Sequence, residues 1–462
     1  MERAISLDHR YPATHRDAFC IPSYGSMGLK SDGANQSDYS TVTYLCGNSL
    51  GCMPKSTRNA INKELDAWAD RAVESHFRHS GEQQGLTSWM DIDLPLSNLL
   101  PSLVGGLESE VAVMGSLTAN LNSLMASFYR PTSSKFKILC EKGAFPSDFY
   151  ALYNQCALHK VDPEEALIRL EVREGESYLR TDDIIRAISD NHEELALVCL
   201  PGVQYYSGQW FDMEKITKFA HQFKDVVVGW DLAHAVGNVP LALHDWGVDF
   251  ACWCSYKYLN SGPGAIAGIF VHEKHSQVGS SDNGRYLPRM AGWWGNNRER
   301  RFQMKEVFEP ISGALGFRQS NPSVIDVVAL KSSLEIIQDF GGINALRERS
   351  LLLTNYLVEL LTALPNYHQK LPKNTSTAGF TILTPLAEKE RGAQLSLLFF
   401  PHHDDRKLDT MERVFDYLNE RGVIVDERRP DVIRIAPVPL YNTFQDVWRA
   451  VTLLNEAIKS IA

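Results

Sequence analysis

Short apolar runs and periodic helical segments alternate through the middle of the chain. The runs have the length of buried strands, and they lie at 136–140, 167–172, 195–200, 226–230, 250–254 and 266–271. Apolar residues at helical spacing predict helices between them at 147–156, 181–189 and 213–223. This alternation predicts an α/β fold with a mainly parallel sheet covered by helices on both faces. Such sheets bind ligands at the carboxyl ends of their strands.

Helical patterns and a second group of strands flank this region. Apolar positions three and four residues apart predict a helix after Pro54, and another helix begins near Thr118. A helical stretch from 324 to about 361 leads to strand-like segments at 380–383, 394–399 and 432–436. We therefore expect an N-terminal arm over 1–40, a large domain over 41–330 and a smaller C-terminal α+β domain over 331–462.

Composition narrows the class of protein. The 462 residues are 44% apolar and 22% charged, as in an ordinary globular protein of two or three domains. The net charge of −10 disfavours binding to nucleic acid or to a membrane surface. No secretory signal or membrane span is visible, and the eight cysteines lack a disulfide framework. We therefore expect buried thiols and a cytoplasmic location.

The most specific chemical signal comes from two strand ends. Asp231 follows the run 226–230, and Lys257 lies just after the run 250–254. Taken singly, Lys257 would be an ordinary solvated lysine and Asp231 an ordinary cap. Together they are what pyridoxal phosphate (PLP) needs, because a lysine holds the aldehyde as a Schiff base and a carboxylate keeps the pyridine nitrogen protonated. With His234 three residues after Asp231, they indicate a PLP enzyme that acts on an amino acid.

Two predicted helix starts extend this constellation. Thr118 opens one helix, whose free backbone N–H groups and dipole attract phosphate, although Thr118 alone would be an ordinary N-cap. The run Phe145-Pro146-Ser147-Asp148 opens another helix, with Pro146 suited to its first turn. Phe145 has the flat face that stacks on a cofactor ring, although without Lys257 it would be interpreted as a core residue.

Further segments place polar and aromatic residues in unusual settings. Two loops, Gly292-Trp293-Trp294-Gly295 and Ser320-Asn321-Pro322, are typical of surface packing at an oligomer contact. Arg434 lies inside the apolar segment 433–437, and a buried arginine needs an anionic partner. A substrate carboxylate would serve, since an arginine can bind it with two parallel hydrogen bonds.

No metal site is expected. Cys252-x-Cys254 lacks a second pair of ligands, and His402-His403-Asp404-Asp405 has the character of a polar loop after a strand. The sequence also lacks a Walker loop, a zincin motif and a Gly-x-Ser-x-Gly elbow.

Long segments of the chain resemble the kynureninase family. They are 45–51, 145–148, 231–238, 244–260 and 434–442, which follow one another in order over nearly the whole chain. The resemblance implies a PLP fold-type I enzyme and a homodimer whose active sites lie at the subunit interface. It implies hydrolysis of L-kynurenine or 3-hydroxy-L-kynurenine to an anthranilate and L-alanine, in tryptophan catabolism and de novo NAD biosynthesis.

The resemblance also implies a role for each site residue. Lys257 resembles the Schiff-base lysine, and Asp231 resembles the pyridinium partner, with His234 beside it. Among the other cofactor contacts, Phe145 would stack on the ring, and Ser147 and Asp148 would line the site. The phosphate would be held by Leu117, Thr118 and Tyr256. The partner subunit would contribute Trp293 and Asn321. Substrate contacts would be His76, Ser320 and Arg434, the last for the α-carboxylate. Tyr256 would also shuttle a proton. The chain departs from the family pattern at 82–87, near His76, and at Pro201, where some relatives carry serine.

Other functions stay open at this point. A cysteine desulfurase or class V aminotransferase would share the fold, but a desulfurase needs a mobile cysteine nucleophile, and the cysteines here are expected to be buried. A non-catalytic PLP-fold protein is disfavoured by the intact Lys257 and Asp231. A metal-dependent carbon–carbon hydrolase would be excluded by insensitivity to chelators.

Overall fold

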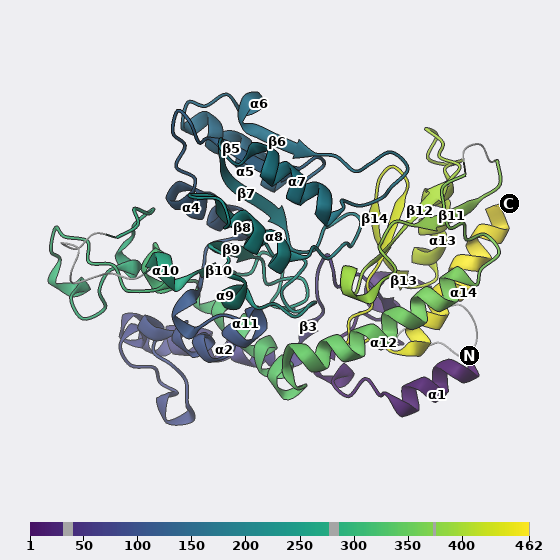
Figure 1. The fold of residues 1–462 in the computed structure, drawn as a ribbon. Coiled ribbons are helices and arrows are strands. Elements are labelled where there is room, and N and C mark those ends of the chain that lie inside the picture. Colours follow the sequence, from purple (N-terminus) through teal and green to yellow (C-terminus); the bar gives the residue numbers. More distant parts are fainter. Residues whose placement is uncertain (31–39, 277–285, 373–375, 462) are drawn as a thin grey trace.

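The computed structural model describes residues 1–30, 40–276, 286–372 and 376–461. A seven-stranded sheet forms the centre of the molecule (Figure 1). Its spatial order is β4 (Val111–Met114), β10 (Ala267–Val271), β9 (Phe250–Trp253), β8 (Val227–Asp231), β7 (Leu195–Pro201), β5 (Lys137–Glu141) and β6 (Leu167–Leu170). The strand β10 pairs antiparallel with β4 and β9, whereas the other neighbours pair in parallel. The predicted α/β fold with a mainly parallel sheet is therefore confirmed.

Helices cover both faces of this sheet because side chains alternate along its strands. In β9, Phe250 and Cys252 belong to one apolar cluster, and Ala251 and Trp253 belong to another. The first cluster packs under α4 (Leu117–Phe128) and α5 (Pro146–Leu158). The second cluster lies on the opposite face, under α7 (Thr181–Asn191), α8 (Met213–Ala220) and α11 (Val324–Asp339). Further helices of this region are α2 (Lys55–Arg71), α3 (Pro101–Val104), α6 (Pro163–Ala166), α9 (Leu243–Trp246) and α10 (Glu273–Ser276).

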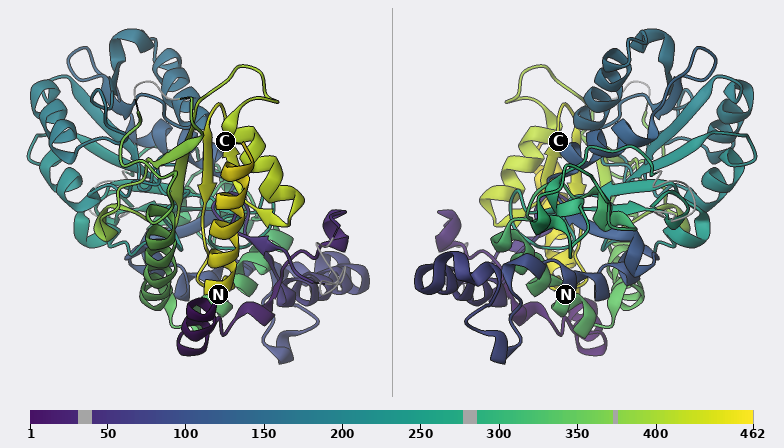
Figure 2. Two further views of the ribbon diagram at one scale, coloured as in Figure 1. Left: turned by 90° about the vertical axis from the view of Figure 1, so that its right-hand side faces the viewer. Right: turned by 90° about the vertical axis from the view of Figure 1, so that its left-hand side faces the viewer.

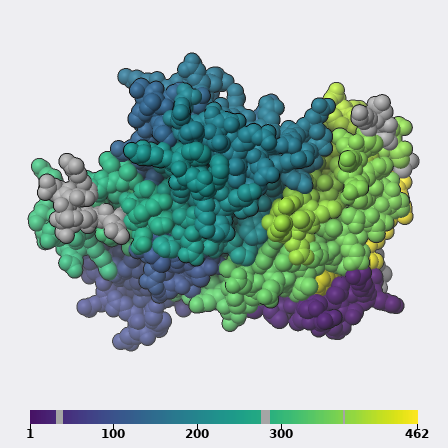
Figure 3. Space-filling view, viewed as in Figure 1, coloured from purple at the N-terminus to yellow at the C-terminus, as the bar shows by residue number. Residues whose placement is uncertain are grey.

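A smaller antiparallel sheet lies in the C-terminal part of the chain. Its order is β11 (Gly379–Ile382), β12 (Leu395–Phe400), β15 (Val432–Ile435) and β14 (Asp426–Arg428). The helices α12 (Gly342–Thr362), α13 (Thr410–Glu420) and α14 (Phe444–Ile461) share its apolar cluster. Figure 2 shows these helices beside the sheet, and Figure 3 shows this green and yellow region against the teal body. The predicted strands 380–383, 394–399 and 432–436 are present within one residue.

The N-terminal segment packs against the C-terminal elements. Its helix α1 (Glu2–Arg10) contacts α14, and Ala4 is fully buried in the cluster of the smaller sheet. The short strand β2 (Thr43–Tyr44) pairs in parallel with β13 (Val423–Ile424), and β1 (Phe19–Cys20) pairs with β3 (Met53–Pro54). The domain boundaries at 40 and 330 stay a prediction.

Two features differ from the sequence-based expectation. The helical stretch 324–361 is broken, because Gly341 (φ 107°) and Gly342 (φ 74°) take the left-handed conformation between α11 and α12. The thiols are not uniformly buried, since Cys20 is exposed and Cys46 is partly exposed, while the other cysteines are buried.

None of the helices in the described residues is long and apolar enough to cross a membrane.

Candidate functional site

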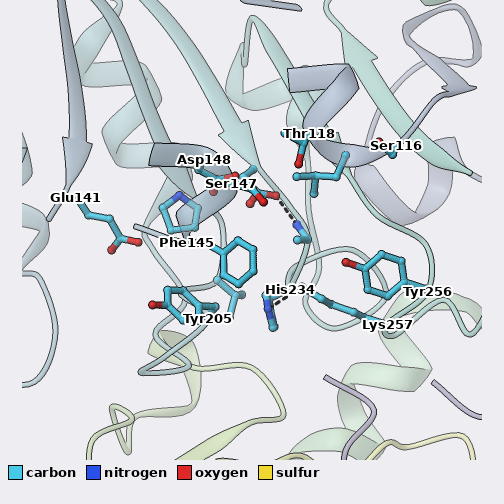
Figure 4. A pocket seen from close by; sticks show the side chains of 15 residues that line it. Ser116, Thr118, Glu141, Phe145, Ser147, Asp148, Tyr205, His234, Tyr256 and Lys257 are labelled. Carbon is cyan, nitrogen blue, oxygen red and sulfur yellow. Dashed lines mark hydrogen bonds between the residues drawn. The ribbon is translucent and has the colours of Figure 1, made fainter. Parts of the chain in front are cut away.

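A cavity of about 140 Å³ opens at the carboxyl edge of the large sheet. Glu141, Pro201 and Asp231, the last residues of β5, β7 and β8, line it (Figure 4). Parallel strands bring their carboxyl ends to one edge, so residues far apart in sequence meet there. Most of the predicted site residues also line this cavity: Leu117, Thr118, Phe145, Ser147, Asp148, Asp231, His234, Tyr256 and Lys257. Pro146 lies beside them as the first residue of α5.

Lys257 and His234 are in direct contact in this cavity. The Nζ atom of Lys257 lies 2.8 Å from Nε2 of His234. Burial lowers the pKa of Lys257, and burial together with the charge of Lys257 places the pKa of His234 well below its usual value. His234 is therefore neutral at pH 7, and its Nε2 can accept a hydrogen bond from the amine. Its Nδ1 is buried without a hydrogen-bond partner.

Carboxyl groups gather on the other side of the cavity. Asp231 accepts a hydrogen bond from the backbone N–H of Ala233 at 2.8 Å. Burial and the neighbouring Asp231 raise the pKa of Asp148 well above its usual value, and its Oδ1 is buried without a partner. Burial raises the pKa of Glu141 to about 8, although Gln204 donates a hydrogen bond to it at 3.3 Å. A bound cationic group would lower the pKa values of these acids and let them ionise, so the cavity favours such a group.

The first turn of α4 forms the anion-binding side of the cavity. Ser116 precedes this 12-residue helix and makes no side-chain capping bond, so backbone N–H groups of the first turn remain available. Thr118 adds a hydroxyl next to them. The helix start is held in place because Asn120 donates a hydrogen bond to the Met114 carbonyl at 2.7 Å.

Aromatic side chains border the centre of the cavity. Phe145 is 40% exposed and meets Tyr205 edge to face, with ring centroids 5.2 Å apart. The ring of Tyr256 lies 5.8 Å from Nζ of Lys257. Burial raises the pKa of Tyr256, so its hydroxyl keeps its proton at neutral pH.

These residues fit pyridoxal phosphate. An amine with a lowered pKa suits an aldehyde, the free N–H groups of α4 suit a phosphate, and Phe145 suits a flat ring. The buried, unpartnered Asp148 Oδ1 and His234 Nδ1 are polar atoms that a bound group would satisfy.

Among the lining residues that sequence reasoning did not assign to the site are Glu141 and Tyr205. Glu141 had a detectable signal, because it ends a predicted strand in the same way as Asp231. Tyr205 lies in a loop after β7 and has no such signal. Pro201 lines the cavity, and neither its side chain nor its backbone nitrogen offers a hydrogen-bond donor there.

The remaining loop residues of the predicted site lie in a second pocket of about 620 Å³. His76, Trp293, Ser320 and Asn321 line it, together with apolar side chains that include Phe77 and Phe302. The described residues include none that line both pockets. Within one chain, these four residues therefore line a different pocket from Lys257. The amide oxygen of Asn321 is buried without a partner.

Arg434 lines neither pocket and has an anionic partner within the chain. It is fully buried, and its Nε and Nη2 lie 2.9 Å and 2.8 Å from Oδ1 of Asp426 on the adjacent strand β14. Its Nη1 donates to the Tyr205 carbonyl at 2.6 Å. The positive charge of Arg434 still contributes to lowering the pKa of Lys257 and of His234. Arg434 therefore influences the cavity electrostatically without lining it.

One His and carboxylate cluster elsewhere in the described residues has the spacing of metal ligands. Glu110, His244 and His272 offer atoms within 4.8 Å of one another. The carboxylate of Glu110 already accepts hydrogen bonds from the N–H groups of Leu107 and Glu273 at 2.9 Å. The rings of His244 and His272 stack with centroids 4.9 Å apart and planes at 25°, and Nδ1 of His244 lies 2.9 Å from Oε1 of Glu110.

Two family models match parts of this chain. A family model described as Aminotransferase class-V matches residues 167–389, and one described as Kynureninase C-terminal domain matches residues 346–454. The kynureninase of Saccharomyces cerevisiae is 62% identical over 100% of both chains, and that of Candida albicans is 56% identical over 100% of this chain and 99% of its own.

Solved structures share the fold at low identity. A cysteine desulfurase from Escherichia coli superposes with a TM-score of 0.70 at 17% identity, covering 98% of this chain and 99% of its own. A cysteine desulfurase from Thermococcus onnurineus gives 0.68 at 15% identity, covering 91% and 95%. These likenesses establish the fold class, whereas the full-length identity with named relatives establishes the family. The chain belongs to the kynureninase family of PLP-dependent, class V aminotransferase-like proteins.

Proposed function

We propose that this chain hydrolyses the Cβ–Cγ bond of L-kynurenine or 3-hydroxy-L-kynurenine, releasing anthranilate or 3-hydroxyanthranilate and L-alanine. The observation that carries the proposal is the contact between Lys257 and His234 in a cavity lined by Asp231, in a chain 62% identical to a kynureninase over its full length. The reaction is a step of tryptophan catabolism, which supplies de novo NAD biosynthesis.

The residues of the cavity would hold pyridoxal phosphate, which supplies an aldehyde for bonding to amines and a pyridinium ring that accepts an electron pair. Leu117 and Thr118 at the start of α4, with Tyr256, would hold the phosphate. Phe145 would stack on the ring, and Asp231 would pair with the ring nitrogen, with Asp148 also lining the site.

Lys257 carries the proton transfers at the substrate Cα. Its lowered pKa leaves a fraction of the amine neutral, as a base requires, and His234 accepts a hydrogen bond from it and orients it. Water adds to the carbonyl carbon Cγ, and the bond between Cβ and Cγ then breaks, leaving Cγ as the carboxyl group of the anthranilate. Tyr256 keeps its proton at neutral pH and donates it to Cβ, and the proton from the added water returns to Tyr256. Together these residues remove a proton from Cα and deliver one to Cβ.

Arg434 is the proposed binding residue for the substrate α-carboxylate. Its pairing with Asp426 satisfies the buried charge while the substrate is absent. Binding a second carboxylate there requires its guanidinium to be shared between Asp426 and the substrate, as a planar group with five donors allows.

A homodimer completes the site in this proposal. His76, Trp293, Ser320 and Asn321 of one subunit would face the Lys257 cavity of its partner, since they lie apart from that cavity in their own chain. Three exposed apolar side chains, Phe77, Met290 and Phe302, line the same pocket, as expected for a contact surface. The expected location is the cytoplasm.

The test is product analysis with the purified, PLP-loaded protein. Incubation with L-kynurenine should yield anthranilate and alanine in equal amounts, and incubation with 3-hydroxy-L-kynurenine should yield 3-hydroxyanthranilate and alanine. The faster reaction identifies the preferred substrate. Bound cofactor with neither product would contradict the proposal and favour another reaction of the same fold.

A further inference from the structure

The side chain of His76 is oriented by an indole ring. His76 ends a short helical turn, Ala72–His76, that begins with Ala72 in the left-handed region (φ 46°). Ser75 anchors this turn through its hydroxyl, which donates to the Ala67 carbonyl at 3.0 Å. The ring of His76 meets Trp89 edge to face, with centroids 5.3 Å apart and planes at 87°. Rotation of the imidazole would therefore break an aromatic contact.

Trp89 is itself fixed by a buried carboxylate. The indole is 8% exposed, and its Nε1–H donates to Oε2 of Glu64 at 2.8 Å. Glu64 lies on α2 and is 3% exposed. The same oxygen lies 3.1 Å from Nε2 of His79, which is 2% exposed. Because Nδ1 of His79 accepts the N–H of Gly81 at 2.9 Å, Nε2 carries the proton and donates to Glu64.

This arrangement is unusual for a purely structural contact. Burying a carboxylate costs free energy unless hydrogen bonds compensate, and an apolar residue would fill the same volume at lower cost. A buried polar network of this kind fixes one geometry, because every donor depends on the same acceptor. The geometry fixed here is that of Trp89, and therefore of His76.

The segment that carries Trp89 is also tied to two other segments that line the second pocket. Asp91 forms an ion pair with Arg298, and Asp93 forms a buried ion pair with Arg318 at 2.5 Å. Trp293 and Ser320, which line the pocket with His76, lie close in sequence to these arginines. The ion pairs therefore link the segment that holds Trp89 to other segments of the pocket.

We propose that Glu64 and Trp89 are positioning residues, which hold the imidazole of His76 in the orientation that binds substrate. The proposal rests on the proposed function, since it takes the second pocket as part of the kynurenine site. It adds a role for two residues that touch neither cofactor nor substrate. In the series of contacts from Glu64 to Trp89 to His76, the buried carboxylate of Glu64 is the group that fixes the other two.

A double-mutant cycle with the PLP-loaded enzyme tests this proposal. Trp89→Phe removes the N–H donor but keeps an aromatic ring, and Glu64→Leu removes the acceptor. Each should lower kcat/KM by about 10-fold, chiefly through KM, with unchanged cofactor content. In a His76→Ala background the same substitutions should change kcat/KM less than about 2-fold, because there is no imidazole left to orient. Glu64→Gln keeps a carbonyl acceptor for the indole and should restore most of the activity.

A merely structural role gives a different result. It predicts lower thermal stability with the same loss of kcat/KM in both backgrounds, and that outcome would overturn the proposal. A readout independent of turnover is the histidine ring NMR spectrum, in which His76→Ala identifies the His76 signal. Trp89→Phe and Glu64→Leu should both shift that signal, and an unmoved signal would also overturn it. Absence of kynurenine cleavage by the unsubstituted enzyme would instead refute the proposed function.

Discussion

At the scale of single residues, the chemistry depends on how burial changes the charges around Lys257. The amine, the neutral His234 and the acids Asp148 and Glu141 all have pKa values shifted by desolvation. Bases with lowered pKa values and acids with raised pKa values in one cavity are typical of a site that moves protons. The residue types and spacing predicted Lys257 and His234, and the family resemblance added Asp148. Glu141 was missed, because a strand-end carboxylate was considered only at Asp231.

The first prediction concerns Lys257. Lys257→Ala should abolish steady-state turnover of kynurenine, because no other amine lines the cavity in the described residues. Lys142→Ala is the matched control, since Lys142 is exposed and forms a surface ion pair with Glu171. The control should keep its activity. Steady-state turnover by the Lys257 variant would show that another group performs the chemistry.

The second prediction concerns Glu141 and pH. Its pKa rises from 4.5 to about 8 on folding, so between these values the folded chain binds more protons than the unfolded chain. Stability of the cofactor-free protein should therefore fall as pH rises from about 4.5 to about 8. Glu141→Gln removes this contribution. The midpoint temperature of thermal unfolding should therefore exceed that of the unsubstituted chain most clearly near pH 8, and differ little at pH 5. An equal effect at both values would show that Glu141 ionises normally.

At the scale of elements, the apolar runs predicted most strands of both sheets, because buried strands need continuous or alternating apolar residues. The pattern did not reveal β4, β14, α13 or α14, and it merged α11 with α12. The break between the last two depends on Gly341 and Gly342, whose left-handed conformation is not encoded in the apolar spacing. The separation of His76 from Lys257 was equally invisible, since it arises from tertiary packing.

The third prediction concerns the close packing of an N-terminal segment on the lysine loop. A Cβ at Gly51 would lie 2.4 Å from the Lys257 carbonyl oxygen and 2.2 Å from Oδ1 of Asn260. Gly51→Ala should therefore displace Lys257 and lower both kcat and the visible absorbance of the bound cofactor. Gly143→Ala is the comparison, because Gly143 has a positive φ but open space around it. It should lower thermal stability by about 1 kcal/mol without loss of kcat. Equal kcat values for both variants would contradict the packing argument.

At the scale of the whole molecule, the proposed function requires the two pockets to meet across an assembly. The family resemblance placed Trp293 and Asn321 in the partner subunit, and the structure places both in a different pocket from Lys257. The domain boundaries and the homodimer remain predictions, since they depend on surfaces that one chain leaves exposed.

The fourth prediction tests the shared site by complementation. Lys257→Ala and Asn321→Ala each damage one half of the site. If each site takes the two residues from different subunits, a mixed dimer contains one intact site and one doubly damaged site. Co-refolding equal amounts should therefore restore about a quarter of full activity, since about half of the dimers are mixed. No recovery from a mixture whose mixed dimers are verified by mass would place both residues in one subunit.

The most direct test of the central claim is to locate the cofactor on the chain. Borohydride reduction of the PLP-loaded protein makes the bond between the aldehyde and the lysine permanent, and peptide mass spectrometry then identifies the modified residue. The cavity geometry predicts modification of Lys257, and loss of that label when L-kynurenine is added before reduction. A label on another lysine, or a label on Lys257 that substrate never displaces, would contradict the assignment of this cavity as the catalytic site.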